Sequence, residues 1–221
     1  MRVAFDVRLT AYTQGGIARY MRQLAHHLPI VAPQHDYWLL HARKDTSPLP
    51  LPRTRAKVCY TPCHHRLERL ALTAELLPLH PDVLHCADFI VPRGGAWRAV
   101  STIHDLAFLE YTEFLTADSR RYYSDQIVAS CERADAIITV SEATRQAVLS
   151  HLNLPAEKVT TIYSGVATRF CPQPAATIAA LRERWQLPAD YLLFVGTFEP
   201  RKNITGLLRG YARLRQDSPQ P

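Results

Sequence analysis

The chain has 221 residues, 47% of them hydrophobic and 21% charged, a composition typical of a soluble globular protein with one large domain or one and a half ordinary ones. No apolar run approaches the roughly 20 residues of a membrane-spanning helix, and Asp6 interrupts the N-terminal apolar run, unlike a secretory signal, so we expect a cytoplasmic chain. The formal charge of +6 favours anionic partners, but the basic residues are scattered without a nucleic-acid-binding pattern, and we expect no nucleic acid.

Short apolar, β-branched runs alternate with longer segments of helical period in the first half of the chain. This alternation predicts βα units around a parallel sheet, which is an α/β, Rossmann-like fold with helices on the faces of the sheet. The expected strands are residues 3–7, 37–42, 57–60, 83–86, 99–103, 136–140 and 159–163.

Three helices are predicted among these strands. The first has apolar residues at helical spacing from Ile17 to Leu28, and Pro29 is expected to end it. The second covers residues 118–134, and the third begins at Ser141, whose hydroxyl can cap free backbone amides.

A domain boundary is expected near residue 168, where turn and linker residues follow the last strand. Residues 1–168 would form the first domain. Residues 169–221 contain a predicted helix at 177–185, a strand from Tyr191 and a helix at 204–214. One strand and two helices cannot form an independent core, so this part is expected to be the start of an incomplete second domain.

Gly15 and Gly16 lie between the first strand and the first helix. A glycine turn lets a ligand approach the backbone, and the start of a helix offers unpaired amides to an anion, so the pair is a candidate phosphate or nucleotide contact. The glycine spacing does not match the dinucleotide fingerprint. The alternative is that the two glycines only turn the chain.

His104 and Asp105 directly follow the strand at 99–103. They are therefore expected at the carboxyl edge of the sheet, where open α/β folds bind their ligands. His104 could donate to a sugar hydroxyl or a phosphate, and Asp105 could orient it. The alternative is a loop histidine followed by a helix-capping aspartate.

Arg201 and Lys202 follow the predicted strand at 191 and a glycine turn at Gly196, just before a helix. Two cations at such a place suit a phosphorylated ligand, because helix-start amides add to their charge. The alternative is a surface salt bridge between one of them and Glu199.

Two further patterns in the sequence are weaker. Cys59, Cys63, His64 and His65 lack a second well-spaced ligand pair, so a zinc site is not expected, and the five cysteines of the chain are expected to stay reduced. Residues 66–77 could form a basic amphipathic helix on a membrane surface, or an ordinary packed helix, since two glutamates lie among its cations.

Several short segments, in this order, resemble glycosyltransferase family 4, whose members have two facing Rossmann-like domains, the GT-B architecture. The resemblance spans nearly the whole chain. The matching segments are Gly15-Gly16-Ile17, Thr102-Ile103-His104-Asp105-Leu106, Thr139-Val140-Ser141-Glu142, Tyr163-Ser164-Gly165-Val166 and Gly196-Thr197-Phe198-Glu199-Pro200-Arg201-Lys202-Asn203.

This resemblance implies a retaining transferase that needs no metal and acts on a nucleotide-sugar donor and a glycan or lipid-linked acceptor. It assigns Gly15 and Gly16 to the phosphates or the acceptor, His104 to the donor sugar, and Arg201 with Lys202 to the donor diphosphate. The last segment is most similar to mannosyltransferases of bacterial surface polysaccharides, which favours GDP-mannose and a site of action at the cytoplasmic face of the membrane.

The resemblance leaves one of the family's features unmatched. The family's second domain carries a pair of glutamates for the donor, and no such pair occurs in these 221 residues. We therefore expect this stretch alone to turn over poorly. A non-catalytic glycan- or partner-binding module is the alternative.

Overall fold

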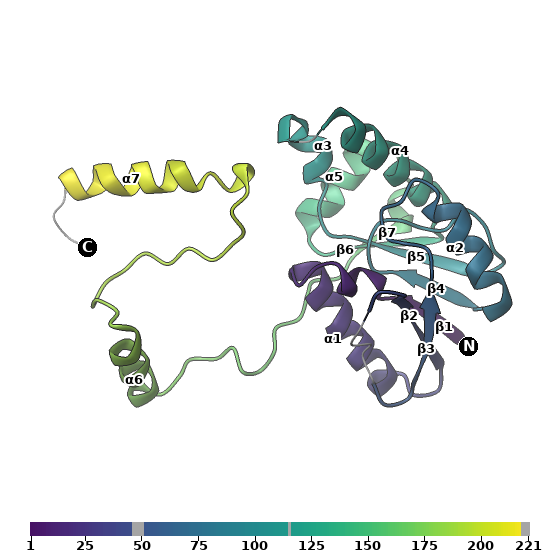
Figure 1. The fold of residues 1–221 in the computed structure, drawn as a ribbon, viewed down its shortest axis with the longest axis horizontal. Coiled ribbons are helices and arrows are strands. Elements are labelled where there is room, and N and C mark those ends of the chain that lie inside the picture. Colours follow the sequence, from purple (N-terminus) through teal and green to yellow (C-terminus); the bar gives the residue numbers. More distant parts are fainter. Residues whose placement is uncertain (46–50, 115, 218–221) are drawn as a thin grey trace. The chain divides into compact units, whose positions relative to one another are not determined.

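The computed structural model describes residues 1–45, 51–114 and 116–217 (Figure 1). The chain divides into two units, Met1–Ser164 and Gly165–Pro221. The boundary expected near residue 168 lies a few residues after this division. Each unit is described by itself.

The first unit is built on a seven-stranded sheet in which all neighbouring strands are parallel. The strand order is β3-β2-β1-β4-β5-β6-β7, so the chain reverses direction across the sheet between β1 and β4. Ligands of open α/β sheets bind at the carboxyl ends of the strands beside such a reversal. The strands are β1 (Arg2–Asp6), β2 (Asp36–Ala42), β3 (Thr54–Cys59), β4 (Val83–Cys86), β5 (Arg98–Ile103), β6 (Ala136–Thr139) and β7 (Val159–Thr161).

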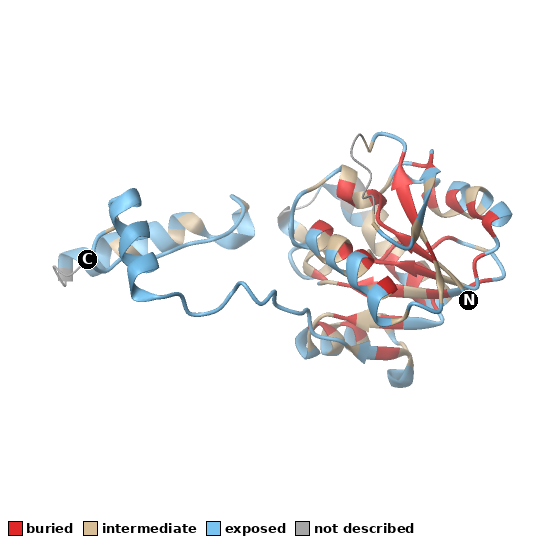
Figure 2. Cartoon of the chain, turned by 90° about the horizontal axis from the view of Figure 1, so that it is seen from below, coloured by how far each residue is buried: buried red, intermediate tan, exposed pale blue. Residues whose placement is uncertain are grey.

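Helices cover both faces of this sheet, because side chains alternate between the faces along each strand. Phe5 packs with Met21 and Ala25 of α1 on one face, while the preceding Ala4 belongs to a larger core with Leu72 of α2 and Ile127 of α4 on the other. Figure 2 shows the buried residues of this unit gathered on the strands and on the inner sides of its helices. The helices are α1 (Gly16–Val31), α2 (Glu68–Leu76), α3 (Ala107–Glu110), α4 (Ala117–Arg133) and α5 (Glu142–Leu152).

The second unit contains α6 (Ala175–Trp185), the short 3-10 helix η5 (Pro200–Lys202) and α7 (Ile204–Asp217). The strand expected from Tyr191 is not formed, which corrects the sequence-based prediction. A strand needs a neighbour to pair with, and the described part of this unit has none to offer. Leu193 and Val195 in this segment are 76% and 84% exposed, although both are apolar.

All seven strands expected in the first unit are present, with shifted ends; the third spans Thr54–Cys59 instead of 57–60. The prediction that Pro29 ends the first helix is wrong, because α1 continues to Val31. Proline removes only one backbone donor, and here the loss falls in the last turn of the helix. Among the described residues, no helix is long and apolar enough to cross a bilayer.

Candidate active site at the carboxyl edge of the sheet

Gly15 and Gly16 lie at the start of α1 and are separated from the end of β1 by the short 3-10 helix η1 (Arg8–Ala11). Gly15 is the N-cap residue with a φ of −67°, a backbone conformation that any residue can adopt. A Cβ on Gly16 would meet no described atom within 4 Å, and one on Gly15 would meet only Thr13 Oγ1 at 3.5 Å. The Gly15 amide donates to Thr13 Oγ1 at 3.2 Å. Among the described residues, no side chain caps the amides that follow it, and the first turn has no acidic residue, so these amides are open to an anion.

His104 follows β5 and is held by three other elements. Its Nε2–H donates to the carbonyl oxygen of Ala87 at 3.0 Å, and the ring of Tyr20 on α1 meets it edge-on at 4.9 Å between centroids. The hydroxyl of Thr144 donates to the His104 carbonyl at 3.2 Å. Because a carbonyl can only accept, the neutral ring keeps its proton on Nε2 and leaves Nδ1 as an acceptor for a ligand hydroxyl.

Asp105 faces a different partner. Its Oδ1 accepts from the amide of Ala107 at 3.0 Å, at the start of α3. Among the described residues, no hydrogen bond joins its carboxylate to His104. Leu106 is the N-cap residue of α3, so Asp105 bonds to the first amide of this helix from the position before the cap. A catalytic role for Asp105 stays a prediction.

A buried layer lies behind His104. His85 Nε2 lies 2.8 Å from Thr102 Oγ1, which is 3.5 Å from the hydroxyl of Tyr20. Burial lowers the pKa of His85 to about 4, and the nearby His104 adds to this shift. His85 is therefore neutral at pH 7 and adds no positive charge beside His104.

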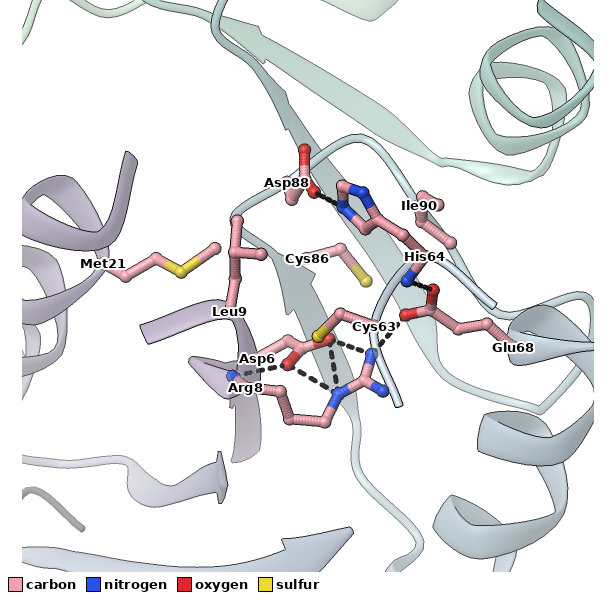
Figure 3. Close-up of a pocket in the computed structure, with 10 residues that line it drawn as sticks. All are labelled: Asp6, Arg8, Leu9, Met21, Cys63, His64, Glu68, Cys86, Asp88 and Ile90. Carbon is pink, nitrogen blue, oxygen red and sulfur yellow. Dashed lines mark hydrogen bonds and ion pairs between the residues drawn. The ribbon is translucent and has the colours of Figure 1, made fainter. Parts of the chain in front are cut away.

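Arg8 forms a buried ion cluster just beyond the end of β1 (Figure 3). Its guanidinium donates to Asp6 Oδ2 at 2.7 Å, to Glu68 Oε1 at 2.7 Å and to the carbonyl of Thr61 at 2.9 Å. Burial opposes its charge, but the two carboxylates raise the pKa of Arg8 further, so it remains a cation. The cluster fixes the ends of β1 and β3 to α2.

His64 and Asp88 form a second pair beside this cluster (Figure 3). His64 Nε2 donates to Asp88 Oδ2 at 2.7 Å; burial opposes the charge, but Asp88 raises the pKa of His64 above its ordinary value. Asp88 directly follows Ala87, the residue that holds His104. A small cavity lies between this pair and the ion cluster. Its volume is about 10 Å³, which is enough for a water molecule but not for a sugar.

The cysteines and histidines weighed as a zinc site do not come together as one. Burial raises the pKa of the thiols of Cys59, to about 12, and Cys63, so both are protonated at neutral pH. His65 is exposed, and the described residues contain no group of three or more histidine, cysteine, aspartate or glutamate side chains placed to hold a metal.

Ser141 and Glu142, at the start of α5, have structural roles. Ser141 Oγ accepts from the amide of Thr144 at 3.1 Å, which confirms the predicted cap. Glu142 accepts from Gln146 and from Thr161 at 2.7 and 2.9 Å, respectively.

Arg201 and Lys202 belong to the second unit, where they form η5 directly before α7. Arg201 donates to Glu199 Oε2 at 2.7 Å, so the predicted alternative of a surface pair is present for this residue. The pKa of Glu199 is lowered, first by a hydrogen bond from Thr197 and then by Arg201. The side chain of Lys202 makes no hydrogen bond or ion pair with the described residues. Exposed pairs are weak, so a diphosphate could displace Glu199.

Sequence reasoning missed the roles of Arg8, Glu68, Asp88 and Tyr20. Arg8 had a local signal, since a cation two residues after Asp6 follows a buried strand. The partnership with Glu68 had none, because 60 positions separate the two residues in the sequence.

Comparison with known proteins gives the same picture of the chain. Residues 14–170 match the family model described as Glycosyltransferase Family 4. The chain is 27% identical over 237 aligned positions to O-antigen chain mannosyltransferase B of Escherichia coli, covering 99% of this chain and 61% of that protein. It is 30% identical over 149 positions to the serotype-specific mannosyltransferase WbdA of Escherichia coli, covering 61% and 18% of the two chains.

Solved structures show the same fold. Anabaena Alr3699/HepE in complex with UDP and glucose aligns with a TM-score of 0.57 at 17% identity, over 84% of this chain and 50% of that chain. The lipopolysaccharide outer core galactosyltransferase WaaB, in its apo form, aligns with a TM-score of 0.51 at 16% identity, over 79% and 49%. The chain thus spans about half of these structures and 61% of the mannosyltransferase.

Proposed function

Because the chain belongs to glycosyltransferase family 4, we propose that it supplies the acceptor-side domain of a retaining transferase that moves mannose from a nucleotide-sugar to a bacterial surface polysaccharide or a lipid-linked precursor. The observation that carries this proposal is the position of His104. His104 is fixed at the carboxyl edge of the sheet, and its Nδ1 has no partner among the described residues. The alignment with a mannosyltransferase covers 99% of the present chain.

In the proposed reaction, the acceptor hydroxyl attacks the anomeric carbon from the face that the diphosphate leaves. The bond from that carbon to the diphosphate oxygen breaks, the new glycosidic bond forms, and the hydroxyl proton passes to the departing phosphate. His104 Nδ1 accepts from a donor-sugar hydroxyl and orients the sugar. The amides at Gly15 and Gly16 approach a phosphate or the acceptor.

Arg201 and Lys202 are proposed to neutralise the charge that builds on the leaving diphosphate. Two cations can do what a divalent metal does in other transferases, so we propose that transfer needs no metal. This assignment predicts that transfer persists in excess EDTA, whereas removing both cations weakens donor binding strongly.

GDP-mannose is the proposed donor, on the strength of the two mannosyltransferase relatives. The neighbour of similar fold was crystallised with UDP, and at 17% identity this carries no information about the base in the present chain. Action at the cytoplasmic face of the membrane belongs to the same proposal, as does the prediction that residues 1–221 alone turn over poorly.

The test uses the 221-residue chain and the longest protein that its reading frame encodes. Each is incubated with radiolabelled GDP-mannose, or with UDP-glucose as the comparison, and a membrane extract that contains lipid-linked glycans. Transfer of label from GDP-mannose by the longer protein, lost in His104→Ala and in Arg201→Ala/Lys202→Ala, is expected. Transfer from neither donor by a folded long protein would favour the non-catalytic binding module, and equal turnover by the short chain would contradict the expected need for further residues.

A further inference from the structure

The two glutamates of α2 face the protein and not the solvent. Glu68 is 2% exposed and accepts from Arg8 in the buried ion cluster. Glu75 accepts from the backbone amides of Tyr60 and Thr61 at 3.0 and 2.9 Å. In the sequence, these acidic residues argue against a membrane-facing helix. In the structure, both carboxylates are bonded to groups of the protein itself, so their negative charges do not face an anionic surface.

The solvent-facing side of the same segment is apolar. Leu67, Leu70 and Leu77 are 55%, 52% and 51% exposed. Leu70 lies on α2, and Leu67 and Leu77 are its N-cap and C-cap residues; the spacing of three and seven residues places the three on one side of this segment. An exposed stripe of leucines beside α2 is an apolar surface of the kind that marks contact with another apolar phase.

A basic groove adjoins this stripe; it is lined by residues of the α2 segment, of α4 and by Arg93, and Leu70 is part of its wall. Its volume is about 530 Å³. Four arginines and one glutamate give the groove a formal excess of three positive charges. The polar side chains that line it are Arg66, Arg69, Arg93, Gln126, Glu132 and Arg133.

Only part of this charge is neutralised by the described residues, since Arg133 pairs with Asp135 at 3.5 Å. Arg69 donates to the carbonyls of Val91 and Ala129 at 2.7 and 2.8 Å, and neither partner is a carboxylate. The side chains of Arg66 and Arg93 make no hydrogen bond or ion pair with the described residues. Burial lowers the pKa of Arg69, and the nearby Arg93 lowers it further. An anion in the groove would therefore relieve repulsion between guanidinium groups that the fold has brought together.

We propose that this groove binds the phosphate of an anionic phospholipid, while Leu67, Leu70 and Leu77 enter the boundary between headgroups and acyl chains. Guanidinium groups match phosphate oxygens with paired hydrogen bonds, and the leucines extend the contact into an apolar phase that a free phosphate does not offer. This site is distinct from the carboxyl edge of the sheet and does not depend on the proposed transferase activity.

The test is co-sedimentation of the chain with vesicles of phosphatidylglycerol or of phosphatidylcholine alone. The variant Arg66→Gln/Arg93→Gln removes two exposed charges without removing a hydrogen bond seen in the described residues. At about fivefold per arginine near an anionic surface, it should bind phosphatidylglycerol vesicles about thirtyfold more weakly. Leu67→Gln/Leu70→Gln should also bind more weakly, through the apolar contact.

The matched control is Arg19→Gln/Arg22→Gln, which removes the same net charge from α1 on the other face of the sheet. We expect it to bind phosphatidylglycerol vesicles nearly as well as the unmodified chain. The groove variant should keep the melting temperature of the unmodified chain, whereas the control loses the hydrogen bond from Arg22 to the Thr10 carbonyl and is compared at a temperature where it is folded. If the control and the groove variant lose the same amount of vesicle binding, net charge alone explains the binding and the proposal is overturned. Equal binding of the unmodified chain to both vesicle types would also overturn it. If inorganic pyrophosphate binds but vesicles do not, the groove takes a soluble phosphate and the lipid assignment is wrong.

Discussion

Acid should destabilise the first unit in a way that can be traced to His85. This side chain is 8% exposed and packs its ring 5.1 Å from that of Phe5, between centroids. Burial lowers its pKa from 6.5 to about 4, so below pH 6.5 the unfolded chain takes up a proton that the folded chain refuses. The stabilisation is fully present above pH 6.5 and is lost as the pH falls towards 4. At about 1.4 kcal/mol per pKa unit, the loss is about 3 kcal/mol of unfolding free energy.

The assay is urea unfolding followed by tryptophan fluorescence between pH 7 and pH 4, on the unmodified chain and on His85→Gln. The glutamine amide can still hydrogen-bond to Thr102 but does not titrate. Since carboxylates elsewhere titrate in both proteins, the readout is the difference between the two pH profiles. We expect the variant to be less stable at pH 7, because the contact with Phe5 is lost, but to lose about 3 kcal/mol less between pH 6.5 and pH 4. Parallel profiles would show that His85 takes up its proton equally well in the folded chain, which would refute the reasoning.

Three further predictions concern single residues. Arg8→Met leaves Asp6 and Glu68 buried without their cation and should lower the unfolding free energy by about 3–5 kcal/mol in urea titrations; unchanged stability would contradict the ion cluster. Gly16→Ala should leave the melting temperature unchanged or higher, because its Cβ meets no described atom, yet should raise the KM for donor or acceptor in the active enzyme; an unchanged KM would mean that the glycine only turns the chain. The pKa of Asp135 is lowered by its hydrogen bond from the Ala99 amide and then by Arg98, so its stabilisation is present above about pH 4 and is lost as the pH falls further. In Asp135→Asn, the melting temperature should therefore fall less steeply with pH below 4 than in the unmodified chain. An equal slope in both proteins would show that Asp135 does not contribute to the acid sensitivity.

The sheet could be predicted because parallel strands buried on both faces are mostly apolar, β-branched runs, as at residues 136–140. The same reasoning placed His104 at the correct edge, since a residue that follows a parallel strand lies at its carboxyl end. It failed at residues 191–195, where an equally apolar run lacks a neighbouring strand in the described residues. A sequence pattern indicates that a segment suits a β-strand, but the backbone hydrogen bonds of that strand also require a neighbouring strand.

The chemistry around the site was harder to predict, because its contacts join residues far apart in the chain. His64 was weighed as a metal ligand beside Cys63, yet its partner is Asp88, 24 positions later. Glu68 and Glu75 counted as surface charges of an amphipathic helix, yet both turn inward. In each case the residue type was informative, and only the packing of α2 against the sheet decided where the side chain points.

Two groups without a hydrogen-bond partner among the described residues, the amides that follow Gly15 and Nδ1 of His104, lie on segments that Tyr20 joins. Tyr20 lies one helical turn after Gly16 on the same side of α1, and its ring packs on His104, so the first turns of α1 contact the segment that carries His104. The layer beneath them has hydrogen-bond partners within the fold, from Thr102 and His85 to the pair of His64 and Asp88. Backbone amides that can only donate, together with an imidazole nitrogen that can only accept, suit a ligand that carries both an anionic oxygen and a hydroxyl. A sugar phosphate has both groups, so the pattern of satisfied and unsatisfied polar atoms favours such a ligand independently of the relatives' names.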